Sequence, residues 1–128
     1  MEKRVIAVLG CVVLLVSLAA HAWAQEPLAF QAMSATVQPQ ADGGSQVTFV
    51  VVLNLNVVPI AFNYHWERSD GAKSGVQVRS VQPGTTSIPI STTWDLGPNA
   101  PVKEIWEKLF IDTGNTHLES EPVKFVIP

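Results

Sequence analysis

The sequence predicts an all-β fold, an antiparallel β-sandwich of about seven short strands. Three observations lead to this prediction. Apolar and polar residues alternate in several short runs, turns rich in glycine and proline separate those runs, and residues 25–128 contain no cysteine that could form a disulfide. A period of two is typical of strands that turn one face toward a core.

The first 24 residues have the organisation of a secretory signal peptide. A charged start, Glu2 to Arg4, precedes an apolar run over residues 5–20, and small residues flank Trp23 before Gln25. We favour cleavage over a retained transmembrane anchor, because no basic stop-transfer cluster follows. We favour it over a lipid anchor at Cys11, because the apolar run continues beyond that cysteine. We therefore expect a secreted or periplasmic protein with no membrane attachment after cleavage.

Residues 25–128 are predicted to form a single domain. Removing 24 residues from 128 leaves 104, enough to bury a core without crosslinks. Two of the eight basic residues and one of the eleven acidic residues lie in the signal peptide, so six and ten remain, a net charge of −4. Nucleic-acid binding needs a basic surface that this composition lacks. The absence of cysteine excludes a disulfide scaffold, a thiol nucleophile and a cysteine metal site.

The strands follow one another along the chain, each with one apolar row. We expect a first strand over residues 32–37, a second over 46–56, a third from Ile60, a short fourth over 76–81, a fifth from Ile88 to Leu96 and a last one from Val123 to Ile127. The inward rows are expected to be Val47, Phe49, Val51, Leu53 and Leu55, then Ile60, Phe62, Tyr64 and Trp66, then Ile88, Ile90, Thr92, Trp94 and Leu96. Pro89 indicates a strand at a sheet edge, since proline cannot donate to a ladder.

The segment from Asn99 to Asp112 fits two structures. Asn99 as a cap, Pro101 in a first turn and apolar residues at helical spacing are typical of an amphipathic helix. The same segment, Ile105 to Asp112 above all, also alternates as a strand does. We favour the strand, because six other strands at short spacing need a partner here.

Several short motifs resemble immunoglobulin-like modules of secreted bacterial proteins. They are Tyr64-x-Trp66-x-Arg68-Ser69-Asp70-Gly71, Pro83-Gly84-Thr85, Thr93-Trp94-x-Leu96-Gly97, Trp106-x-Lys108-Leu109 and Phe125-x-Ile127. The resemblance covers most of residues 47–127. It implies an immunoglobulin-like sandwich and no particular activity, since one fold hosts many functions.

The predicted core differs from that of antibody domains, because the cysteine pair between the sheets is missing. Leu53 and Leu109 are the candidate replacements, and Trp66 is the expected core tryptophan, with Phe62 beside it. A ligand platform at Trp66 is the alternative. Because the cysteine pair is missing, apolar packing must supply the roughly 2–5 kcal/mol that a disulfide between the sheets contributes in small secreted domains.

Arg68 and Asp70 lie where the aromatic strand ends, and we list both as candidate partner contacts. We expect Arg68 to form a structural ion pair, with Asp95 or Asp112 as the acid, in preference to binding an anion. Asp70 with Gly71 indicates a turn.

No catalytic, cofactor or metal site is predicted. His65 and Glu67 lie two residues apart on the face opposite Trp66, and a zinc site or a catalytic pair would need a third group. The remaining histidine, His117, falls in the turn before the last strand with no sign that it approaches His65. Glu104 and Glu107 are the carboxylates that a hydrolase would use, but a domain of this size offers no obvious cleft for them.

The sequence favours a non-enzymatic module that binds a protein or a cell-surface polymer through loops or an edge strand. The polar loop over residues 69–75 is long enough to contact a partner. The alternative is carbohydrate binding, which would require Trp94 or Trp106 to be an exposed stacking ring on a sheet face. The partner's identity does not follow from these residues.

Overall fold

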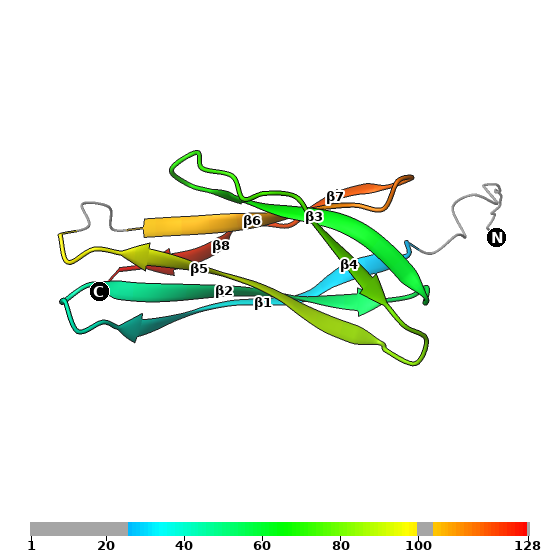
Figure 1. Ribbon diagram of the computed structural model, residues 1–128, viewed down its shortest axis with the longest axis horizontal. Coiled ribbons are helices and arrows are strands. Elements are labelled where there is room, and N and C mark those ends of the chain that lie inside the picture. The colour runs from blue at the N-terminus through cyan, green and yellow to red at the C-terminus, as the bar shows by residue number, and fades with distance from the viewer. Residues whose placement is uncertain (1–25, 100–103, 128) are drawn as a thin grey trace, which may run out of the picture.

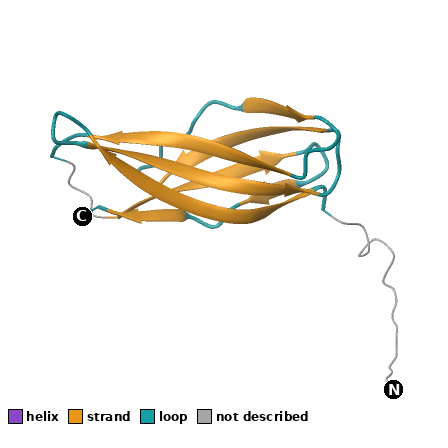
Figure 2. Cartoon of the chain, turned by 90° about the horizontal axis from the view of Figure 1, so that it is seen from below, coloured by secondary structure: helices purple, strands orange, loops and turns teal. Residues whose placement is uncertain are grey.

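Two antiparallel β-sheets pack face to face in the computed structural model, which describes residues 26–99 and 104–127 (Figure 1). The predicted signal peptide lies outside the described residues. The longer strands run along the sandwich, and loops connect them at its two ends (Figure 2). Within the described ranges, no helix has the length and apolar character that a membrane crossing requires.

The first sheet has the strand order β1-β2-β5, and the second has the order β4-β3-β6-β7 with β8 also paired to β6. The bounds are β1 (Leu28–Pro39), β2 (Ser45–Leu55), β3 (Ile60–Arg68), β4 (Gln77–Val81), β5 (Ser87–Leu96), β6 (Glu104–Asp112), β7 (His117–Glu119) and β8 (Val123–Val126). The immunoglobulin-like sandwich predicted from the sequence is confirmed. The described residues form eight strands where about seven were expected, because β7 and β8 pair in succession with the two ends of β6.

The alternating rows predicted from the sequence form the core. All five predicted inward residues of β2 are buried, and on β5 the buried residues are Ile88, Ile90 and Trp94. Pro89 lies on β5, which is an edge strand as predicted. Burying these rows removes apolar surface from water. Each Å² of buried apolar surface stabilises the fold by roughly 25 cal/mol, and this is the main favourable term in folding.

Residues 104–112 form strand β6, which decides between the two structures that the sequence allowed. Ile105, Leu109 and Ile111 point into the core, while Trp106 and Phe110 lie on the outer face. β6 is hydrogen-bonded to β3 on one side and to β7 and β8 on the other. This pairing satisfies its backbone groups on both edges, so tertiary context overrides the helical spacing.

The short strand β4 pairs with β3 and therefore belongs to the second sheet. In the constant type of immunoglobulin domain, the fourth strand instead joins the sheet of the first, second and fifth strands. The exchange leaves β5 and β1 as the two edges of a three-stranded sheet.

The centre of the core contains the residues that the sequence analysis assigned to it. Trp66 and Phe62 of β3 are buried, and so are Leu53 of β2 and Leu109 of β6. All four belong to one apolar cluster between the sheets. The two leucines lie on β2 and β6, one in each sheet, and both contribute to the close packing between the sheets.

Candidate binding surface

The aromatic motif beginning at Trp66 builds the loop between β3 and β4. The Trp66 amide donates to the Ser74 hydroxyl at 2.8 Å, and the Ser74 amide donates to the Trp66 carbonyl at 2.9 Å. The Asp70 carboxylate accepts from the Ala72 amide at 3.0 Å, and Gly71 has a φ of 91°, which favours glycine. The loop is therefore held by its own hydrogen bonds, as a turn motif requires.

Arg68 forms its ion pair with Asp70, so the expected partners Asp95 and Asp112 were wrong. Nη2 of Arg68 lies 2.5 Å from Oδ2 of Asp70, and Nε lies 3.1 Å from Oδ1. The pair is local because the two residues are two apart in a tight turn. The hydrogen bond from Arg68 lowers the pKa of Asp70, and the same bond raises the pKa of Arg68.

Trp94 is not an exposed ring, so its assignment as a candidate ligand contact is corrected. Its exposed fraction is 8%, and the guanidinium carbon of Arg68 lies 4.1 Å from its ring centroid. Trp94 is on the inward row of β5, which turns it toward the opposite sheet. Arg68 thus contacts both Asp70 and Trp94, and the three form a structural cluster at one end of the sandwich.

Glu107 is buried, which the sequence did not predict. It lies on the inner face of β6 with an exposed fraction of 1%, whereas Glu104 is exposed, so the two carboxylates do not face a common cleft. Within the described residues, Oε2 of Glu107 and Nε1 of Trp66 have no hydrogen-bond partner. Burial raises the pKa of Glu107 to about 7, although the charge of Arg68 opposes this rise.

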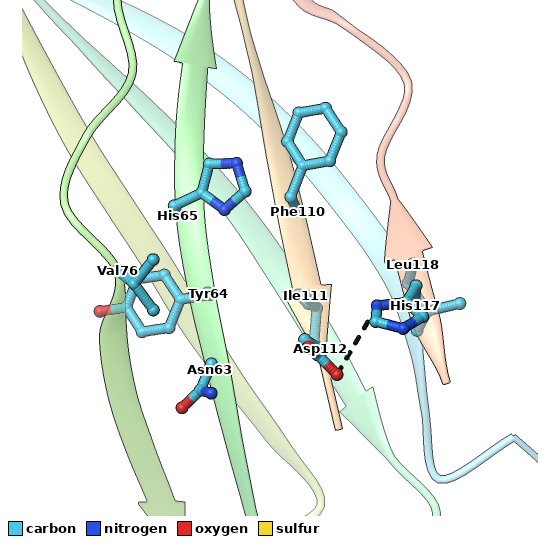
Figure 3. Close-up of a pocket in the computed structure, with 9 residues that line it drawn as sticks. All are labelled: Asn63, Tyr64, His65, Val76, Phe110, Ile111, Asp112, His117 and Leu118. Atoms are coloured by element: carbon cyan, nitrogen blue, oxygen red, sulfur yellow. Dashed lines mark ion pairs between the residues drawn. The ribbon is translucent and has the colours of Figure 1, made fainter. Parts of the chain in front are cut away.

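The outer face of the second sheet contains a depression with a volume of about 360 Å³ (Figure 3). Its floor includes His65 of β3 and Phe110 of β6, which are paired across the strands. Their rings stack with centroids 4.9 Å apart and planes 7° from parallel. Val76 forms part of the rim and is strongly exposed. This is a partly apolar, ring-lined hollow on a face that the core does not use.

Polar and charged groups surround the stacked rings. Nε2 of His65 lies 2.9 Å from Oε2 of Glu67, and Lys73 approaches the same carboxylate at 3.7 Å. The hydrogen bond with His65 is the main cause of a lowered pKa at Glu67. Farther across the sheet, Lys108 pairs with Glu119. These charged groups lie near the stacked rings, while Asn63, Asp112 and His117 line the depression itself and can orient a ligand by hydrogen bonds.

His117 lies closer to His65 than the sequence suggested, because both line this depression (Figure 3). β7 pairs with β6 so that His117 stands opposite Asp112, and Nδ1 of His117 lies 3.6 Å from Oδ1 of Asp112. The register of β7 brings them together, and the sequence contained no signal for that strand. In the described part of the chain, no three His, Cys, Asp or Glu side chains are grouped as metal ligands would be.

Trp106 shares the outer face with Phe110, separated from it along β6 by Lys108. Its ring is partly exposed, and Nζ of Lys108 lies 5.9 Å from its centroid. Of the two tryptophans proposed as ligand contacts, Trp106 is the one on a solvent-facing side of a sheet.

Comparison with known proteins adds little to this description. No family model matches the chain, and no curated protein sequence matches it. Among solved structures, the chain is similar to a protein from Archaeoglobus fulgidus, with a TM-score of 0.45 and 10% sequence identity over 78% of this chain and 98% of that one.

Proposed function

We propose that this chain is a secreted, non-enzymatic immunoglobulin-like module that binds a protein or cell-surface partner on the outer face of β3 and β6. The depression floored by His65 and Phe110 is the observation that carries the proposal. Aromatic residues are enriched in protein interfaces, and a few of them supply most of the binding energy. The signal-peptide pattern of residues 1–24 supports export to a compartment where such partners lie.

The division of labour among the aromatic residues supports this location. Trp66, Trp94 and Phe62 are buried in the core, so they are not available to a partner. Phe110 and His65 stand on the outer face of the second sheet and are not part of the apolar core cluster. A partner that inserts an apolar side chain would cover Phe110 and Val76, while polar groups beside that side chain would meet Asp112 and His117.

The test is a selection of displayed peptides on immobilised residues 25–128, followed by affinity measurements on two variants. Phe110→Ala should weaken the selected peptides at least about tenfold, the loss of about 1.4 kcal/mol or more that is typical of an interface anchor. Ser91→Ala, at an exposed position of β5 in the other sheet, is the matched control and should leave affinity unchanged. Peptides that bind wild type and Phe110→Ala equally well would place the contact elsewhere.

Carbohydrate binding is the second candidate, and the position of Trp106 favours it. A partly exposed indole on a sheet face is the kind of ring on which a sugar stacks, and Lys108 beside it offers a hydrogen-bond donor. Tryptophan fluorescence with a soluble quencher and a panel of cell-wall and plant polysaccharides tests this. Protection of a quenchable signal that disappears in Trp106→Phe would favour the carbohydrate function, and an unchanged spectrum would favour the protein partner.

A further inference from the structure

Strand β1 is the longest edge in the described structure and has the least protection against pairing. Its 12 residues, Leu28–Pro39, contain no charged side chain. β2 pairs with one side of β1, and among the described residues no strand pairs with the other side. Natural proteins usually protect such edges with charges, prolines, bulges or short length.

The other edges of the sandwich have these protections. β5 contains Pro89 and Asp95, β4 is five residues long with Arg79 in its centre, and β7 and β8 have only three and four residues. β1 has a bulge near Gln31, where its register with β2 shifts. The bulge leaves residues 32–39 as a regular, uncharged edge.

The inner face of this edge is also incompletely covered. Met33, Ala35 and Val37 pair with buried residues of β2 and so point to the core side. Yet Met33 is 41% exposed and Val37 is 39% exposed, while the β2 residues opposite them are completely buried. β8 of the second sheet lies near β1 but leaves Met33 and Val37 partly uncovered, so apolar surface remains beside the edge of β1 that is unpaired in the described structure.

We propose that a second copy of this chain pairs with β1, strand against strand, to form a twofold dimer with one continuous six-stranded sheet. The inference is independent of the proposed function, which concerns the other sheet. β1 matches its own reversed sequence when Ala35 lies on the twofold axis, because Met33 then faces Val37 of the second copy and Ser34 faces Thr36. Apolar residues meet on the inner face and hydroxyl residues on the outer face.

The charge and composition of β1 favour this pairing. No like charges meet across the strands, because β1 has none. An antiparallel pairing of residues 32–38 would form about six new backbone hydrogen bonds, and the two Met33 and Val37 contacts would remove apolar surface from water. An extended partner with charged side chains would lack this complementarity.

The first experiment measures the mass of residues 25–128 in solution by sedimentation equilibrium over a range of concentrations. This segment contains every described strand and the whole apolar core cluster. We expect the average mass to rise with concentration toward twice the mass of the chain. Val37→Lys should weaken the dimer at least about tenfold, since it places an unpaired charge against Met33 of the second copy. Val78→Lys, on the exposed edge strand β4, is the matched control and should stay dimeric.

A pair of cysteine variants tests the register. In the proposed dimer the two copies of Ala35 are directly opposite, with Cβ atoms about 4.5–5.5 Å apart, so Ala35→Cys should form a disulfide-linked dimer under mild oxidation. Two copies of Thr36 would be diagonal neighbours about 7–8 Å apart, beyond disulfide reach, so Thr36→Cys should crosslink much more slowly. Both variants place the new thiol on the same strand.

The outcomes separate the possible occupants of the edge. A dimer that Val37→Lys disrupts and Val78→Lys retains, with fast crosslinking only at position 35, supports the proposal. A monomer at all concentrations overturns it, and so does a dimer that Val37→Lys leaves intact. A monomer whose β1 amides gain exchange protection only when an extended peptide is added would assign the edge to a different partner and also overturn it.

Discussion

Glu107 should make the stability of this sandwich fall as pH rises from about 4.5 to about 7. Its carboxyl is buried on the inner face of β6, with Oε2 unpaired in the described structure. Burial raises its pKa from 4.5 to about 7. Replacing Glu107 by Gln retains the shape of the side chain and removes the charge, so it isolates the cost of ionising this group in the core.

The sign follows from proton binding. In the unfolded chain the carboxyl ionises near pH 4.5, whereas in the folded chain it keeps its proton up to about pH 7. Between these values the folded state binds more protons, so the free energy of unfolding decreases as pH rises and then levels off. A difference of about 2.5 pH units at about 1.4 kcal/mol per unit gives a loss of about 3.5 kcal/mol.

The assay is urea unfolding of wild type and Glu107→Gln at several values between about pH 5 and pH 8.5, followed by the fluorescence of the buried Trp66. The variant should resemble wild type most closely near pH 5 and be more stable by up to about 3.5 kcal/mol at the upper end. Glu104→Gln, at an exposed position of the same strand, is the control and should follow wild type throughout.

Parallel curves for wild type and Glu107→Gln would refute this reasoning. They would show that the carboxyl meets water or forms a close pair with Arg68 in solution, so that burial does not control its ionisation. A variant advantage that is largest at low pH would have the wrong sign and would be equally damaging.

Two further predictions concern the cluster at the end of the sandwich and the leucine pair. Arg68→Ala should make Trp94 accessible to a soluble quencher and cost about 1 kcal/mol, because the guanidinium covers the ring and pairs with Asp70; unchanged quenching would mean that Arg68 is not the cover. Leu109→Ala should lower the free energy of unfolding by about 2–5 kcal/mol in chemical denaturation, since Leu109 is completely buried; a loss below about 1 kcal/mol would show that the cavity collapses.

The strands were predictable wherever a local pattern determined them. The inward rows of β2 and β5 follow directly from alternation, and Pro89 marked an edge strand from sequence alone. The main aromatic residues of the core were also predictable, because Trp66 and Phe62 lie on one apolar row of an alternating segment. These features depend on a residue and its near neighbours in the sequence, and the side-chain period of a strand predicts them.

The site depended on pairings between strands that are distant in sequence. The sequence contained no signal for β7, so it could not place His117 on the rim of the depression beside His65. Arg68 was assigned a distant acid because the turn geometry that presents Asp70 is decided by the loop's own hydrogen bonds. Register is a property of two strands, and one strand's pattern leaves its partner open.

The sequence by itself thus determined the fold class, the central strands and the aromatic core, because burying alternate residues is a local requirement. Only the tertiary structure decided that β4 joins β3, that Glu107 faces inward with Oε2 unpaired among the described residues, and that one side of β1 has no strand partner in the same part of the chain. Each of these depends on which strand lies beside which. That choice is made by the whole packed sandwich, since the free energy of a pairing includes the surfaces that both strands bury.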